Sequence, residues 1–364
     1  MLGGMKGTAN MFGWSVSGGV LAAALSMLAA MPVAALDTGA AAPEALRQRA
    51  AALAAQAEEK GVVAGREGWL FLTSELHFLA AGTFWGEAAV KVSRAARPEW
   101  ADPLPAILDF DAQVKKAGAT LVFAPVPPKA AIYPDRLPGE PVLPVPTQRL
   151  DTHLAEFLEL LRAKGVNVLD LTPAFLAHRA RQGDDETQRL YCKTDSHWSP
   201  VACGVAADCL YERLAELKAL PPPDGHTYVA EPRTLLLRGD LTRMPGGETG
   251  ESETLPAPTV ADESGAPPAD CRDSPILLVG DSHLLVFHVG EDMHATGAGL
   301  ADRLALRLRA AVDVVGVRGS GASPSRIALL RRGDQLAGKK VVVWLMTARE
   351  FTETQGWRLV PVVK

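Results

Sequence analysis

The feature that most constrains the fold is the alternation of short apolar runs with amphipathic helical patterns. Strands that are apolar along their whole length are buried on both faces, and helical connections between such strands make them parallel. The sequence therefore predicts an α/β fold with three layers, in which helices cover both faces of a central, mostly parallel sheet. The expected strands are residues 120–126, 166–171, 275–282, 311–317 and 339–346, and the expected helices are residues 42–60, 145–165, 199–220 and 299–310.

The first 35 residues have the pattern of a secretory signal peptide. They contain one basic residue, Lys6, then an apolar run over residues 20–31 and the small pair Ala34 and Ala35. This run is shorter than the ~20 residues that span a bilayer, so we expect cleavage after Ala35, with an uncleaved inner-membrane anchor as the alternative. We then expect a helix and linker over residues 36–64 and a single periplasmic domain over residues 65–364.

Composition limits the classes of partner and cofactor. The net charge of −5 comes without a block of Lys or Arg, which argues against nucleic acid. An even number of cysteines in an exported chain predicts up to two disulfides, and their spacing matches no zinc motif. We therefore expect neither a metal nor a cofactor. The cysteines are Cys192, Cys203, Cys209 and Cys271, and two proline-rich stretches, residues 125–146 and 255–271, are expected to be loops.

A candidate nucleophile follows the apolar run "ILLVGDS". Ligands of open α/β sheets bind beyond the carboxyl ends of the strands, and Ser282 stands at such an end, after Gly280 and Asp281. Its hydroxyl would face the crevice, while the N–H of Ser282 would face a developing oxyanion. The alternative is that Ser282 only caps the following helix.

A candidate base lies in the stretch "YCKTDSHWSP". A serine needs an imidazole to take its proton, and the imidazole needs a partner that fixes its tautomer. Asp195 and His197 are two residues apart, so in an extended segment their side chains point the same way. Pro200 would open the next helix. The alternative is a solvated loop in which Asp195 caps that helix.

Further residues have weaker signals. The glycines Gly319 and Gly321 in "RGSGAS" allow close backbone approach, and we interpret them as oxyanion donors or as an ordinary turn. Trp198 is interpreted as a sugar platform or as a core residue. Arg349, after the last strand, is interpreted as a substrate contact or as an ion-pair partner of a neighbouring acid such as Glu350.

Two histidines close to Ser282 in the sequence are rival bases. On a helix, the side chain of His283 would point away from the serine, and His288 would lie on a helix face. Neither spacing makes a metal-binding pair specific. We interpret both as structural.

At these residues the chain resembles the SGNH-hydrolase-like domain of the alginate O-acetyltransferases, the AlgJ and AlgX group. In ordinary SGNH esterases the serine comes first and the acid–base pair last. Here Asp195 and His197 precede Ser282, and a D-x-H pair replaces D-x-x-H, as in the acetyltransferase group. The stretches that carry the resemblance are residues 65–78, 125–137, 191–200, 277–287 and 341–351.

The resemblance implies a fold, a reaction and partners. It implies an SGNH-hydrolase-like, flavodoxin-like sandwich with permuted motif order, a nucleophilic Ser282, a base His197 and an orienting Asp195. The reaction would be acetyl transfer to an exopolysaccharide through an acetyl-serine, with a membrane-bound acyltransferase as donor and other polysaccharide-secretion proteins as partners. The acceptor stays open between alginate, acetylated cellulose and other polymers, because Asp281 stands where the alginate enzymes tend to carry Thr. No room remains after Lys364 for the carbohydrate-binding module that AlgX carries, so we expect a layout like that of AlgJ.

Two other functions use the same sequence features. A carbohydrate esterase would employ the same three residues with water as the acceptor. A non-catalytic polysaccharide-binding protein would keep the fold and tolerate replacement of Ser282. The simultaneous presence of a nucleophile, a base and an acid favours an enzyme over the binding protein.

Overall fold

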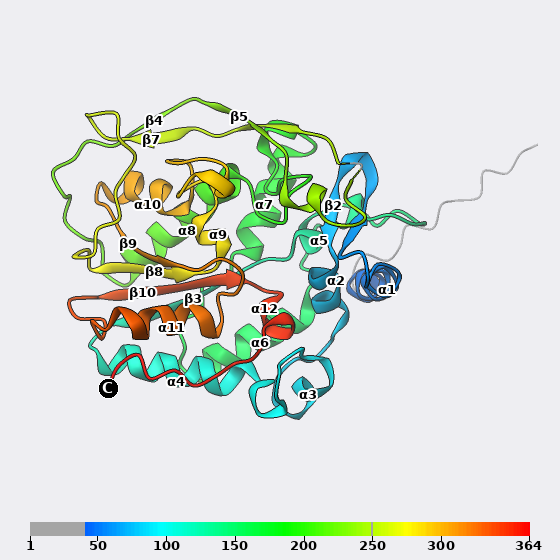
Figure 1. Cartoon of the computed structure of the whole chain (residues 1–364), viewed down its shortest axis with the longest axis horizontal. Helices are drawn as coiled ribbons and strands as arrows, with labels where there is room; N and C mark the ends of the chain where they lie inside the picture. Colours follow the sequence, from blue (N-terminus) through cyan, green and yellow to red (C-terminus); the bar gives the residue numbers. More distant parts are fainter. Residues whose placement is uncertain (1–40, 249) are drawn as a thin grey trace, which may run out of the picture. The chain divides into compact units, whose positions relative to one another are not determined.

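Four parallel strands form the central sheet of the computed structural model, which describes residues 41–248 and 250–364. Their order across the sheet is β3-β10-β8-β9, so that β10 lies between β3 and β8 (Figure 1). All four carboxyl ends therefore meet at one edge. The strands are β3 (Thr120–Val126), β8 (Ile276–Gly280), β9 (Asp313–Gly316) and β10 (Val341–Thr347).

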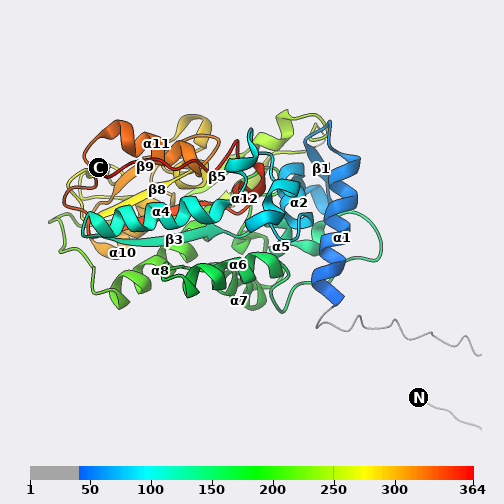
Figure 2. The same ribbon diagram turned by 90° about the horizontal axis from the view of Figure 1, so that it is seen from below.

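Alternate side chains of these strands fill two separate cores. In β10, Val343 and Leu345 lie in the core that contains α8 (Pro200–Glu216) and α10 (Leu300–Leu308). Val342 and Trp344 lie in the core that contains α4 (Pro103–Lys116) and α11 (Ser323–Arg332). Figures 1 and 2 show these helices on opposite faces of the sheet. A strand residue is buried whichever face it points to, which explains the continuous apolar runs.

Twelve α-helices surround the sheet in the described residues. The alternation of strands and helices and the coverage of both faces confirm the predicted three-layer α/β fold. The helices are α1 (Ala41–Gln56), α2 (Thr73–Ala80), α3 (Ala89–Val92), α4 (Pro103–Lys116), α5 (Lys129–Ile132), α6 (Thr152–Ala163), α7 (Thr172–Gln182), α8 (Pro200–Glu216), α9 (Ser282–Leu285), α10 (Leu300–Leu308), α11 (Ser323–Arg332) and α12 (Glu350–Glu353).

Three antiparallel ribbons accompany the sheet in the described part of the chain. Two of them join segments distant in sequence: β4 (Val229–Glu231) with β7 (Thr259–Ala261), and β5 (Thr234–Leu237) with β6 (Glu253–Pro256). The third is the hairpin of β1 (Val62–Ala64) and β2 (Leu70–Leu72). The proline-rich stretch 255–271, predicted to be a loop, therefore contains β7 and the end of β6.

The expected strand over residues 166–171 is wrong in extent. Val168 makes only one isolated parallel bridge, to Phe123 at the edge of the sheet. The chain then turns into α7, because the Asp170 carboxylate accepts a hydrogen bond from the N–H of Thr172 at 3.1 Å. The proline-rich stretch 125–146 likewise includes the short helix α5.

The cysteines are free thiols in the structure, which corrects the predicted disulfides. Cys203 and Cys209 both lie on α8, six positions apart, so their Cα atoms are about 9 Å from each other, beyond the reach of a disulfide. Cys192 is buried and faces the carbonyl of Trp198 at 3.6 Å. The segment predicted to be a signal peptide, residues 1–35, lies outside the described residues. Within residues 41–248 and 250–364, no helix combines the length and apolarity needed to cross a bilayer.

A buried lysine joins three segments beneath the loop 191–198. The ammonium of Lys129 on α5 donates to the carbonyls of Leu70 at 2.6 Å, Lys193 at 3.0 Å and Asp195 at 3.1 Å. Burial lowers the pKa of Lys129, and the nearby carboxylates of Glu253 and Glu75 oppose this shift. The three donated bonds hold β2 and the loop that carries Asp195 in a fixed relation.

Because β8 lies in close contact with β10, one methyl group added at Gly280 should destabilise the fold. A Cβ at Gly280 would lie 2.4 Å from the carbonyl oxygen of Leu345, so Gly280→Ala should lower the free energy of unfolding by about 2 kcal/mol or more. Gly204, inside α8, has open space around it, so Gly204→Ala should raise the same quantity by up to about 1 kcal/mol. Urea unfolding of both variants tests this difference in sign, and equal effects would contradict it.

The lysine beneath the loop gives a second prediction. Lys129→Met removes three hydrogen bonds from a charged donor and should lower the free energy of unfolding by about 3 kcal/mol or more. The matched control is Lys193→Met, because Lys193 makes a partly exposed ion pair with Glu186 at 3.0 Å, worth less than about 1 kcal/mol. Chemical denaturation measures both. Two variants of equal stability would contradict the role of Lys129.

Candidate functional site

A short hairpin presents Asp195 and His197. Tyr191 and Trp198 form an antiparallel bridge, and the N–H of Cys192 donates to the carbonyl of His197 at 3.4 Å. The hairpin leads into α8, whose first residue is Pro200. The cap of this helix is Ser199, whose hydroxyl accepts from the N–H of Ala202 at 3.3 Å. Asp195 is therefore free of the capping role that the sequence left open.

The turn after β8 presents Ser282. Asp281 is the N-cap of α9, and one of its carboxylate oxygens accepts from the N–H of His283 at 2.9 Å. The other oxygen accepts from the N–H of Thr347 at the end of β10, at 2.8 Å. Asp281 thus ties the nucleophile turn to the neighbouring strand, and Ser282 is the first helical residue rather than the cap.

The hairpin and the turn bring three predicted residues together. Nε2 of His197 lies 2.8 Å from Oγ of Ser282, and Nδ1 lies 2.6 Å from Oδ1 of Asp195. Their side chains come from positions 85 residues apart in the sequence. All three residues are buried, and Ser282 exposes 7% of its surface. The geometry is that of a nucleophile, a base and an orienting acid.

The charges fix the direction of the hydrogen bonds. Burial opposes ionisation of Asp195, but the hydrogen bonds and positive charge of His197 and His294 hold its pKa well below the usual range. An ionised carboxylate only accepts, so Nδ1 of His197 carries the proton and Nε2 accepts from the Ser282 hydroxyl. Burial would lower the pKa of His197, but the charge of Asp195 more than offsets this and raises it above its ordinary value of 6.5.

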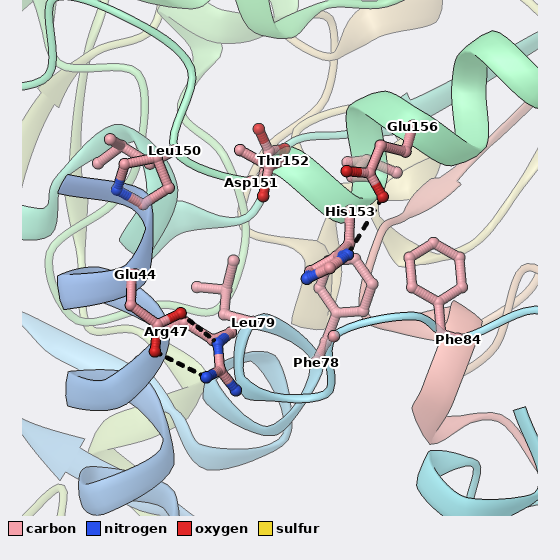
Figure 3. Close-up of a pocket in the computed structure, with 13 residues that line it drawn as sticks. Glu44, Arg47, Phe78, Leu79, Phe84, Leu150, Asp151, Thr152, His153 and Glu156 are labelled. Carbon is pink, nitrogen blue, oxygen red and sulfur yellow. Dashed lines mark hydrogen bonds and ion pairs between the residues drawn. The ribbon is translucent and has the colours of Figure 1, made fainter. Parts of the chain in front are cut away.

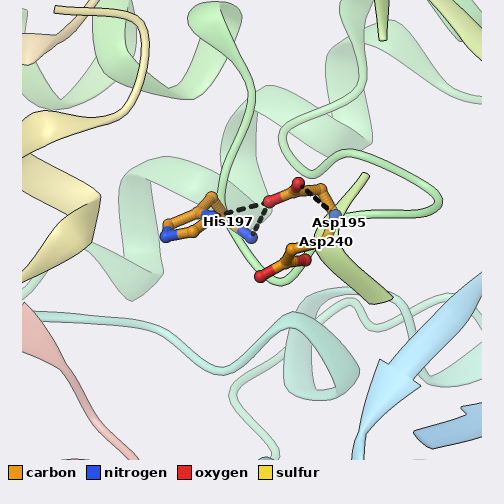
Figure 4. Close-up of side chains that lie close together, drawn as sticks. All are labelled: Asp195, His197 and Asp240. Atoms are coloured by element: carbon orange, nitrogen blue, oxygen red, sulfur yellow. Dashed lines mark hydrogen bonds and ion pairs between the residues drawn. The ribbon is translucent and has the colours of Figure 1, made fainter. Parts of the chain in front are cut away.

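Asp240 and His294 complete the surroundings of Asp195, and the sequence analysis missed both. The N–H of Asp240 donates to Oδ2 of Asp195 at 2.8 Å, and Nε2 of His294 lies 2.9 Å from the same oxygen. Figure 4 shows Asp240 beside Asp195 and His197. Gly239 permits this approach, because a Cβ there would lie 2.1 Å from the carbonyl oxygen of Thr194. No short motif connects these positions, which are 45 and 99 residues from Asp195.

The cluster of Asp195, His197 and Asp240 has donor atoms close enough to hold a metal ion. Its atoms already have hydrogen-bond partners: both oxygens of Asp240 accept from Ser196, from the N–H at 2.7 Å and from Oγ at 2.6 Å. A cation here would displace these donors and the proton on Nδ1 of His197. The donor set fits a hydrogen-bond network better than a metal site.

The rival histidines have other partners. The ring of His283 lies 4.9 Å from that of His197, and burial lowers its pKa to about 4, so it is neutral at pH 7. His288 contacts Asp302 at 3.0 Å and Asp270 at 3.1 Å. Although burial opposes it, this pairing raises the pKa of His288 to about 10. Neither histidine contacts Ser282 through a hydrogen bond in the described residues.

The predicted oxyanion loop reaches the nucleophile turn at one of its two glycines. A Cβ at Gly321 would lie 3.1 Å from the Cβ of Asp281, so the loop packs directly on the turn. The carbonyl of Gly321 accepts from Nε1 of Trp344 at 2.8 Å, which fixes the loop on β10. Gly319 adopts a φ of 98°, and a Cβ there would meet nothing within 4 Å. It therefore lies in the open part of the loop.

Trp198 and Arg349 have different surroundings. Trp198 is fully buried, and its Nε1 donates to the carbonyl of His283 at 3.0 Å, so its ring has no exposed face for a sugar. The half-buried Arg349 precedes α12 and donates to Oγ1 of Thr347 at 3.3 Å. Its positive charge also acts on the pKa of His197 and of Asp281. Because the N–H of Thr347 donates to Asp281, Arg349 contacts the residue that is bonded to the nucleophile turn.

A separate pocket of about 400 Å³ lies between α1, α2 and α6 (Figure 3). Its apolar floor includes Phe78 and Phe84, and Figure 3 shows Arg47 paired with Glu44 at its rim. None of Ser282, His197 and Asp195 lines it. It is therefore distinct from the site of the three central residues.

Comparisons with known proteins agree with this fold. The chain is 28% identical over 200 residues to a probable alginate O-acetylase AlgJ of Pseudomonas aeruginosa, covering 54% of this chain and 44% of that protein. It is 27% identical over 237 residues to the corresponding protein of Pseudomonas putida, covering 65% and 55%. The chain thus spans about half the length of the curated relatives that it matches.

Solved structures show the same fold. The O-acetyltransferase domain of Pseudomonas putida AlgJ matches with a TM-score of 0.58 and 24% identity, covering 80% of this chain and 92% of that one. AlgX of Pseudomonas aeruginosa matches with a TM-score of 0.58 and 15% identity, covering 83% and 66%. The family model of the SGNH hydrolase-like domain of acetyltransferase AlgX matches residues 62–348. With most of its length matched, this chain belongs to the family of the AlgX-type SGNH hydrolase-like domain.

Proposed function

We propose that the chain is an O-acetyltransferase that moves acetyl groups onto hydroxyls of an exopolysaccharide through an acetyl-serine at Ser282. One observation carries the proposal: a single imidazole, that of His197, bridges Oγ of Ser282 at 2.8 Å and Oδ1 of Asp195 at 2.6 Å. The family membership supports acetyl transfer, since relatives are alginate O-acetylases.

In the first half-reaction, Nε2 of His197 takes the hydroxyl proton while Oγ of Ser282 attacks the carbonyl carbon of an acetyl ester. The imidazolium then gives this proton to the departing alcohol oxygen as the ester bond breaks. The products are the acetylated serine and the free donor alcohol. Asp195 keeps its negative charge throughout and stabilises the imidazolium.

In the second half-reaction, an acceptor hydroxyl takes the place of the donor alcohol. His197 removes its proton, the acceptor oxygen attacks the acetyl carbon, and the proton returns to Oγ of Ser282. The tetrahedral intermediates of both halves need donors for their oxyanion. We assign these to the N–H of Ser282, which opens α9, and to the loop of Gly319 and Gly321, with Gly321 packed on the turn.

The proposal also covers the acceptor polymer, the acetyl donor and the cellular location. Arg349, close to His197 and Asp281, supplies a cation that would attract an acidic sugar such as a uronate. We therefore propose alginate or a similar polymer as the acceptor. We also propose that the reaction takes place in the periplasm. A membrane-bound acyltransferase would deliver the acetyl group. The family membership supports transfer to a polymer over hydrolysis.

Replacement of the nucleophile tests the proposal. Ser282→Ala should lower kcat for an activated acetyl ester by about a thousandfold or more, because no oxygen remains to accept the acetyl group. The matched control is Ser264→Ala, in an exposed loop where the hydroxyl donates only to Asp262. The assay measures release of the donor alcohol and, by mass spectrometry, acetylated oligosaccharide.

Each outcome of this assay points to one function. Serine-dependent acetylation of oligosaccharide supports the transferase. Free acetate without acetylated product would indicate an esterase instead. Equal inertness of the wild type and Ser282→Ala, with binding of polymer retained, would indicate a non-catalytic binding protein.

The raised pKa of His197 predicts the pH dependence. The base acts in its neutral form, and the charge of Asp195 raises its pKa above 6.5, so kcat/KM should be flat at high pH and fall as pH drops through that pKa. The inflection should therefore lie above pH 6.5. Rates with an activated ester across pH 5 to 9 measure it. An inflection at or below pH 6.5 would contradict the assigned pairing.

A further inference from the structure

The carboxylate of Asp195 is shared between two histidines. Oδ1 accepts from Nδ1 of His197 at 2.6 Å and from its N–H at 3.0 Å. Oδ2 accepts from the N–H of Asp240 at 2.8 Å and lies 2.9 Å from Nε2 of His294. Asp195 is fully buried, so each donor contributes to holding the charge there. Only one of the two imidazoles also reaches Ser282.

The loop that follows α9 holds His294 in place. The N–H of Phe287 donates to the carbonyl of Met293 at 2.8 Å, and the N–H of Ala298 donates to the carbonyl of Phe287 at 2.9 Å. The ring of His294 lies 5.8 Å from that of Phe287. The loop therefore extends from the nucleophile helix and brings a side chain back to the acid.

His294 occupies an unusual backbone conformation. Its φ of 74° and ψ of −50° fit the centre of a classic γ-turn, and the N–H of Ala295 donates to the carbonyl of Met293 at 3.0 Å across it. Such a conformation costs about 1–3 kcal/mol in a residue other than glycine and persists where its surroundings determine it. Here the conformation aims the imidazole at Oδ2 of Asp195.

We propose that His294 is a positioning residue, which holds Oδ2 of Asp195 so that Oδ1 stays aligned with Nδ1 of His197. This inference rests on the proposed function, since alignment matters only if His197 moves protons. Without the His294 contact, the N–H of Asp240 alone would hold Oδ2, and the carboxylate would rotate about its single bond more freely. A misplaced acid then misorients the base.

The contact also has an electrostatic effect on His197, whose sign is opposite to that of the positioning effect. A neutral His294 that donates to Oδ2 draws charge away from Oδ1, and a charged His294 repels the His197 imidazolium, so loss of the electrostatic effect alone would raise the pKa of His197. Loss of the alignment of Oδ1 with Nδ1 would lower this pKa, because Asp195 is the group that raises it. The positioning role therefore predicts a lower pKa of His197 when the contact is lost. The other charged or titratable groups that face His197 or His294 are Asp240, His283, Arg349 and Asp292.

Two variants separate the effect of the side-chain contact with Asp195 from the effect of the positive φ at residue 294. His294→Asn tolerates positive φ well but is too short to reach Oδ2, whereas His294→Gln extends its amide about as far as Nε2. The control is His226→Gln, which replaces an exposed histidine paired with Glu263. Circular dichroism and urea unfolding establish that each variant is folded.

The first readout is the pKa of His197, from NMR titration of protein with ¹⁵N-labelled histidine, assigned with His197→Gln. The second is kcat and KM for an activated acetyl ester. In His294→Asn we expect the pKa to fall by about half a unit or more and kcat to fall by about tenfold to a hundredfold, with KM little changed. His294→Gln should retain most of kcat, and His226→Gln should match the wild type.

The outcomes separate this inference from the proposed function. An unchanged or raised pKa of His197 in folded His294→Asn would overturn the positioning role, even if the enzyme is active. A lowered pKa together with a wild type that shows no serine-dependent turnover would support the positioning role and refute the proposed function. If His294→Asn does not fold, the Gln variant decides, because a kcat as low as that of His197→Gln would overturn the inference.

Discussion

The structure around the site depends on one buried negative charge, the carboxylate of Asp195. A charge removed from water is costly unless several donors compensate it. Four hydrogen bonds reach this carboxylate, from His197, Asp240 and His294. These residues belong to three segments: the hairpin 191–198, the segment after β5 and the loop after α9. The hydrogen bonds that compensate the Asp195 charge are therefore the same ones that hold the three segments together. If one segment were displaced, its donor would lose its partner and the carboxylate would be less well compensated.

The hairpin that carries Asp195 is fixed from its other side as well. The buried carboxylate of Glu253 accepts from the N–H groups of Lys193 at 2.9 Å and Thr194 at 2.8 Å, and Lys129 donates to the Asp195 carbonyl. Polar networks of this kind rigidify a structure when every member is satisfied. The positions of the reacting atoms thus depend on backbone groups as much as on the three side chains. This explains why a site assembled mostly from loops keeps distances of 2.6 and 2.8 Å.

Sequence reasoning succeeded where a residue type or a hydrophobic pattern alone indicates the structure. Apolar runs identified β3, β8, β9 and β10, because strands buried on both faces have few polar residues. The types and order of Asp195, His197 and Ser282 sufficed to group them, and the structure brings them within hydrogen-bond distance.

Sequence reasoning failed where tertiary contacts decide the role of a residue. Trp198 is a core residue because its indole finds a carbonyl inside, and the two cysteines of α8 lie too far apart for a disulfide. The sequence did not identify His294, because its role depends on a γ-turn that no short motif predicts. It did not identify Asp240, because its approach to Asp195 depends on the neighbouring Gly239, which has no recognisable pattern with an aspartate.

The three histidines near Ser282 differ in their surroundings, and these differences assign their roles. His283 has no carboxylate in good hydrogen-bond geometry for its buried Nδ1, and its pKa falls to about 4, so it stays neutral and packs against His197. His197 has Asp195 on one nitrogen and the serine on the other, so it alone has both a stabilised imidazolium and a proton to exchange. His294 contacts the acid but not the serine, so it influences the base without exchanging a proton with the nucleophile. The neutral ring of His283 matters for the same reason: a second positive charge 4.9 Å from His197 would oppose the imidazolium on which both half-reactions of the proposed transfer depend.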